Sequence, residues 1–129
     1  MITLSDVEWM LSEEFDVFQR NQMLVITSGD LNGFVVTSDF AGTPVVTIQF
    51  LPGTGLQPSP ALYRWVSVTA GKFVLGSLSA DLDNDGSVDV WFRHSLFDSS
   101  LEAEDLNLVV RVMANTATDL RRDLNSLFG

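Results

Sequence analysis

The fold of this chain is decided by the stretch from Lys72 to Leu96, KFVLGSLSADLDNDGSVDVWFRHSL. Two apolar runs, Phe73–Leu78 and Val88–Phe92, flank an acidic turn that ends in Asn84–Gly86. In both runs apolar residues recur at alternate positions, which is the spacing of half-buried strands. Asn, Asp and Gly tolerate the positive φ that tight hairpin turns require. The stretch therefore predicts a β-hairpin.

The length and composition predict one acidic domain covering residues 1–129. Of the 129 residues 46% are hydrophobic, which is enough for a compact core. Seventeen acidic residues against 7 basic ones give a formal net charge of −10. Such a surface repels phosphate backbones, so nucleic acid and anionic membranes are not expected partners. The negative charge has two alternative explanations: it keeps the domain soluble, or it attracts a partner that has a basic surface.

Cysteine is absent, which excludes disulfides, thiolate metal clusters and a cysteine nucleophile. The first residues, Met1–Asp6, lack the basic and then apolar organisation of a signal peptide. No apolar run approaches the roughly 20 residues that a membrane-spanning helix needs. We expect a cytoplasmic protein.

Local patterns predict the elements that surround the hairpin. Ser5–Glu8 has the form of a helix capping box, and apolar residues at helical spacing predict a first helix over residues 5–19. Turn residues then separate three predicted strands: 23–27, 33–39 and 43–51. Ser59-Pro60 is typical of a helix start and predicts a short helix over 60–69, with a strand as the alternative because Val and Thr are frequent there. Apolar residues spaced by threes and fours predict a long amphipathic helix over 101–127.

These elements give the order α-β-β-β-α-β-β-α. We predict an α+β fold in which an antiparallel sheet carries its helices packed on one face. In the strand over 43–51, alternation places Val45, Thr47 and Gln49 on the face opposite to the core. Trp91 alternates with buried positions in the hairpin and should also lie on the outer face. An outward tryptophan serves a binding partner or is covered by a helix or a second subunit, and both alternatives imply contact.

The acidic turn also resembles the front of a calcium loop. Asp81, Asp83 and Asp85 stand at alternate positions, followed by Gly86. The glutamate expected at position twelve is replaced by Phe92. Calcium binding is therefore an alternative interpretation of a turn that otherwise needs no ligand.

No catalytic motif is visible. His94 is the only histidine, and its neighbour Ser95 points to the opposite face of a strand, so the two cannot form a dyad. We expect no enzyme activity, no cofactor and no metal site.

The order of elements and the small acidic domain resemble the YbjN family and the class I type III secretion chaperones. The most specific likeness is to YbjN-type domains, in the segment LYRWVSVTAGKFVLGSLSADLDNDGSVDVWF from Leu62 to Phe92. It continues in residues 100–106 and 117–120. The resemblance implies a homodimer that binds protein or peptide segments as a chaperone or regulator, without a cofactor. The outer-face residues that we expect to bind are Val45, Thr47, Gln49 and Trp91. A calcium-responsive regulatory domain built on Asp81–Asp89 is the alternative.

Overall fold

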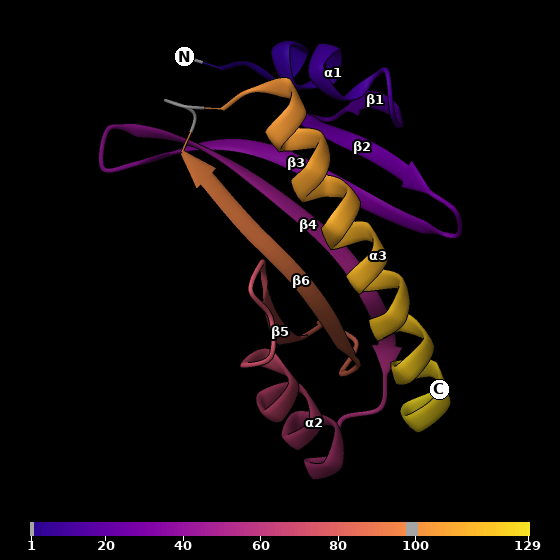
Figure 1. The fold of residues 1–129 in the computed structure, drawn as a ribbon. Coiled ribbons are helices and arrows are strands. Elements are labelled where there is room, and N and C mark those ends of the chain that lie inside the picture. Colours follow the sequence, from indigo (N-terminus) through magenta and orange to yellow (C-terminus); the bar gives the residue numbers. More distant parts are fainter. Residues whose placement is uncertain (1, 98–100) are drawn as a thin grey trace.

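The fold is that of a computed structural model, which describes residues 2–97 and 101–129 (Figure 1). In these ranges the chain forms, in order, α1 (Leu4–Leu11), β1 (Asp16–Arg20), β2 (Met23–Ser28), β3 (Leu31–Phe40), β4 (Thr43–Leu56), α2 (Pro60–Ala70), β5 (Ser77–Leu82), β6 (Val88–Phe97) and α3 (Ala103–Phe128).

Within the described residues, six antiparallel strands form one sheet in the order β1-β2-β3-β4-β6-β5. Neighbours in the chain are neighbours in the sheet except at one point, where α2 leads from β4 to the far edge and β6 returns to lie beside β4. The predicted α+β class with an antiparallel sheet is confirmed.

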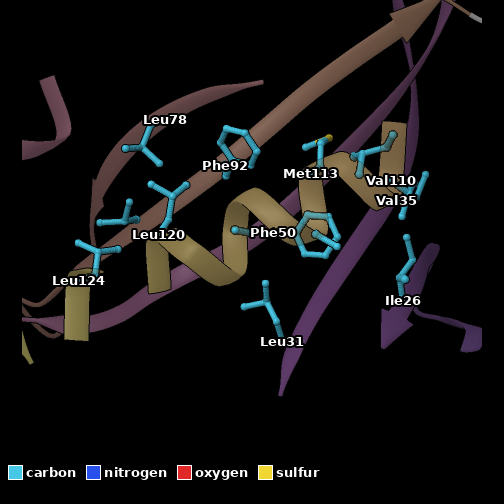
Figure 2. Packing of buried hydrophobic residues seen from close by; sticks show 14 of the residues in the cluster. Ile26, Leu31, Val35, Phe50, Leu78, Phe92, Val110, Met113, Leu120 and Leu124 are labelled. Atoms are coloured by element: carbon cyan, nitrogen blue, oxygen red, sulfur yellow. The ribbon is translucent and has the colours of Figure 1, made fainter. Parts of the chain in front are cut away.

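All three helices contribute to one core on the same face of the sheet. In Figure 1, α3 runs along the sheet, while α1 and α2 lie towards opposite ends. Figure 2 shows the α3 residues Val110, Met113 and Leu120 among the strand residues Phe50 and Phe92, and these five side chains are buried. Helix α2 adds its buried residues Leu62 and Val66 to the same cluster. The other face, which we call the open face, is covered by no helix in the described part of the chain.

The predicted hairpin is confirmed, with a later start. Strands β5 and β6 pair from Leu82 opposite Val88 to Ser77 opposite Arg93, so β5 begins at Ser77. The prediction that the strand begins at Phe73 is wrong. Phe73 instead lies in the loop before β5, where its ring packs edge-on against Phe92 at 5.0 Å between centroids.

The first helix is shorter than predicted, and the predicted order lacks one strand. Helix α1 ends at Leu11, and residues 16–20 form β1. Both residues of the turn between β1 and β2, Asn21 and Gln22, have positive φ (50° and 63°), the conformation that two-residue hairpin turns favour. This turn pairs β1 with β2 and removes residues 16–19 from the helix.

The cap of α1 also differs from the prediction. Thr3, and not Ser5, is the N-cap: its hydroxyl accepts from the amide of Asp6, whose carboxylate accepts in return from the amide of Thr3. The helix predicted for residues 60–69 is confirmed and the strand alternative is wrong, with Ser59 accepting from the amide of Leu62 at 3.1 Å. The long helix is confirmed within two residues at either end. None of the helices in residues 2–97 and 101–129 is long and apolar enough to cross a membrane.

Candidate functional site

The open face is built from the strand residues that alternate with the core residues. The four residues expected to bind all lie on it, on the adjacent strands β4 and β6. Their register is set by Gln49 opposite Arg93 and Thr47 opposite Ser95. The side chains that β2, β3, β4 and β6 place on this face include Val25, Phe34, Val45, Thr47, Gln49, Trp91, Arg93, Ser95 and Phe97.

Trp91 and Arg93 form the centre of a polar and aromatic cluster on this face. The ring of Trp91 lies 6.3 Å from that of Phe34 between centroids, which brings aromatic residues of β3 and β6 together across β4. The guanidinium of Arg93 lies over Trp91 and donates hydrogen bonds to Gln49 Oε1 (3.1 Å), Ser79 Oγ (3.1 Å) and Asp81 Oδ2 (3.3 Å). These bonds hold Trp91 between an apolar and a cationic neighbour, an arrangement that is frequent in protein interfaces.

Val45 and Thr47 line a hollow of about 280 Å³ at the other end of the open face. Phe40 and Phe97 border it and are 70% and 58% exposed. Val45 itself is buried, so it forms part of the floor. The hydroxyl of Thr47 hydrogen-bonds to that of Ser95 at 2.8 Å. The hollow can therefore accept an apolar side chain, with two hydroxyl groups nearby to orient a polar neighbour.

The predicted residues thus lie on one face but in two groups. Gln49 and Trp91 belong to the cluster around Arg93, and Val45 and Thr47 belong to the hollow. Sequence reasoning missed Phe34, Arg93, Phe40 and Phe97. The period-two spacing from Trp91 was a signal for Arg93 and Phe97, whereas Phe34 joins the site only through the sheet order.

The acidic turn uses its carboxylates within the fold. Asp81 pairs with Arg93, and Asp85 accepts from the amide and hydroxyl of Ser87 at 2.9 and 2.7 Å. Asp89 accepts from the hydroxyl of Thr54 and the amide of Gly55 at 3.0 and 3.1 Å. In residues 2–97 and 101–129, no three His, Asp or Glu side chains are placed to hold a metal ion. The calcium interpretation therefore finds no ligand set in this part of the chain.

The pKa values of two aspartates of the turn are shifted in opposite directions. A hydrogen bond with Asp89 is the main cause that raises the pKa of Asp83, with smaller contributions from burial and from nearby carboxylates. Hydrogen bonds from the side chain and backbone of Ser87 lower the pKa of Asp85. The turn thus contains one carboxyl that favours its proton and one that favours its charge.

His94 faces the core side of the sheet and not the open face. It lies opposite Ile48, and its Nδ1 accepts a hydrogen bond from the amide of Gly76 at 3.1 Å. Its position is that of a structural residue that secures the loop before β5.

Comparison with known proteins supports the fold. No protein-family model and no curated protein sequence matches this chain. Its structure is similar to the crystal structure of YbjN, a candidate transcription regulator from E. coli, with a TM-score of 0.72 and 14% sequence identity. The similarity covers 97% of this chain and 93% of the other. The predicted likeness to YbjN is confirmed at the level of the fold, and the likeness to secretion chaperones stays a prediction: the chain has a YbjN-like fold.

Proposed function

We propose that this protein is a non-catalytic regulatory or chaperone-like module that binds protein segments on its open face and acts as a homodimer. The observation that supports this best is the pair of features on one helix-free face, the Trp91 cluster and the hollow between Phe40 and Phe97. Aromatic residues and arginine are the residue types that dominate binding energy in protein interfaces. An extended segment can place one side chain in the hollow and pack another against Trp91.

The charge of the chain favours protein as the partner. At −10 the molecule repels nucleic acid phosphates, so a regulatory role would be exercised through protein contacts. The similarity to a candidate transcription regulator is compatible with such a role. The homodimer follows from the family resemblance.

The absence of catalysis is part of the proposal. The single histidine is engaged with the amide of Gly76 on the core side of the sheet. Three aspartates of the acidic turn are also engaged: Asp81 pairs with Arg93, Asp85 accepts from Ser87, and Asp89 accepts from Thr54 and Gly55. These contacts support a role without catalysis, since acyl and phosphoryl transfer use a nucleophile and a base within hydrogen-bond reach of each other.

The proposal is tested by capturing the tagged protein from its own lysate and sizing the complex by light scattering. Wild-type protein is expected to be a dimer that retains a stoichiometric protein partner. Trp91→Ala is expected to lose the partner, because the alanine removes the aromatic surface shared with Phe34. Trp9→Ala is the matched control, since Trp9 is 77% exposed and belongs to α1, which packs on the other side of the sheet.

The comparison of the two variants decides whether the partner binds specifically on the open face. Loss of the partner in both variants would indicate nonspecific binding by exposed tryptophan. Retention of both the dimer and the partner by Trp91→Ala would rule out the open face as the binding surface.

A further inference from the structure

A second candidate binding surface lies on the side of the sheet opposite to the open face, between α2 and the last turn of α3. It is an open groove of about 690 Å³. Trp65 and Phe128 meet edge to face in it, with 6.3 Å between ring centroids. Val68 of α2 and Leu127 of α3 line the groove and are 60% and 59% exposed. Two helices thus leave apolar side chains uncovered on either side of an aromatic pair.

Arg64 and Lys72 also line this groove. Together with Val68 they are spaced by four residues, so they follow one stripe of α2 and the turn after it. Arg64 lies within α2 and Lys72 lies two residues after its end, with the apolar Val68 between them in the sequence. The amide of Lys72 donates a hydrogen bond to the carbonyl of Thr69 at 3.0 Å, which holds this residue in the turn that follows α2.

These two cations have no acidic partner in the described part of the chain. The ion pairs there belong to Arg93, Arg111 and Arg122. A chain with 17 acidic residues and 7 basic ones has nevertheless left two basic residues unpaired beside its uncovered apolar groove. The groove is therefore locally complementary to an acidic and apolar partner, although the molecule as a whole is acidic.

We propose that the groove binds an acidic amphipathic helix of a partner protein. Its apolar side chains would pack between Val68 and Leu127, over Trp65. Two of its carboxylates, two turns apart on one face, would meet Arg64 and Lys72, because these two long side chains line the same groove and can adjust to that spacing. The inference rests on the proposed function only in taking the partner to be a protein, and it concerns a different surface.

The test uses the purified full chain and a capped synthetic helical peptide. The peptide carries two glutamates two turns apart with leucines between them, and a control peptide has lysines in place of the glutamates. Binding is measured by calorimetry. In a Trp9→Phe and Trp91→Phe background, Trp65 is the only tryptophan left, and its emission should shift to the blue when the acidic peptide covers it.

The acidic peptide is expected to bind the wild-type chain better than the lysine peptide. Arg64→Glu and Lys72→Glu should each weaken its binding about tenfold, since each replaces an attraction by a repulsion. Arg20→Glu makes the same change of charge on β1, outside the groove, and should have little effect. The double variant with Arg64→Glu and Lys72→Glu should prefer the lysine peptide, which a merely unfolded protein would not do.

Three results would overturn the inference. The first is equal binding of both peptides, or none, by the wild-type chain. The second is binding that Trp91→Ala abolishes and the groove variants leave intact, which would move the peptide to the open face and support the proposed function instead. The third is a dimer that Arg64→Glu dissociates, which would show that a second copy of this chain occupies the groove.

Discussion

The guanidinium carbon of Arg93 lies 4.8 Å from the centre of the Trp91 ring, two residues away on the same face of β6. This contact links the aromatic surface of the open face to the polar row formed by Gln49, Ser79 and Asp81. Neither residue is fully buried, so the contact holds a binding surface in shape without removing it from solvent.

Arg93→Ala should lower the free energy of unfolding by about 1 kcal/mol, because it removes a cation–π contact, hydrogen bonds to Gln49 and Ser79, and a partly exposed ion pair. Arg93→Lys should recover only part of this, since an ammonium cannot reach several acceptors in one plane. Urea denaturation measures both. Equal stability of the alanine variant and the wild type would contradict the prediction.

Gly33→Ala should destabilise the fold by about 2 kcal/mol through overpacking. A Cβ atom at Gly33 would lie 2.5 Å from Cε1 of Phe50, a side chain buried in the core and therefore unable to move aside freely. Gly71→Ala is the control, since a Cβ there meets nothing within 4 Å. Thermal unfolding of the two variants should show a large decrease in Tm for Gly33→Ala and none for Gly71→Ala.

Leu124→Ala should lower the free energy of unfolding by about 3 kcal/mol, because Leu124 is fully buried and the substitution leaves a cavity. Leu127→Ala, one turn later on α3, should change the stability little, since Leu127 is exposed. The same variant should weaken the binding of the acidic peptide to the groove between α2 and α3. A Leu127→Ala protein that unfolds as easily as Leu124→Ala would place Leu127 in the core.

Asp83 and Asp85 should give opposite responses to pH. The folded state holds the proton of Asp83 more tightly than the unfolded chain does, so stability falls as pH rises from 3.8 through the raised pKa. Asp83→Asn should therefore raise Tm at neutral pH and leave it unchanged in acid. Asp85 contributes stability above its unfolded pKa of 3.8, and this is lost as pH falls through its lowered value.

Asp85→Asn should accordingly lower Tm at neutral pH, with the difference disappearing in acid. The two variants carry the same change of charge two residues apart, so a general charge effect would move both in one direction. Scanning calorimetry across the acid range separates these outcomes.

Calcium at millimolar concentration should not raise Tm beyond the effect of magnesium. Asp85 is bonded to Ser87, Asp81 to Arg93 and Asp89 to the last residues of β4, so binding calcium would break contacts that already stabilise the turn. A shift specific to calcium that Asp83→Ala with Asp85→Ala abolishes would restore the calcium-responsive alternative.

Much of the fold could be predicted because its signals are local. The long helix over 103–128 and the pairing of β5 with β6 follow from periodicity and turn chemistry within each segment. The outward position of Trp91 follows from the same alternation. Strand β1 could not be found in this way, because Phe15 and Phe18 fit the helical spacing of α1 and only the pairing with β2 decides between the two.

The candidate sites depended more strongly on tertiary structure. Sequence alone placed Val45, Thr47, Gln49 and Trp91 on one face, since side chains of a strand alternate. Only the sheet order brought Phe34 to Trp91 across β4, and only the packing of α2 against the end of α3 made the groove beside Arg64 and Lys72. The physical reason is the sequence separation of the interactions. Backbone periodicity is set by neighbouring residues, whereas contacts between distant segments depend on how the whole apolar core packs.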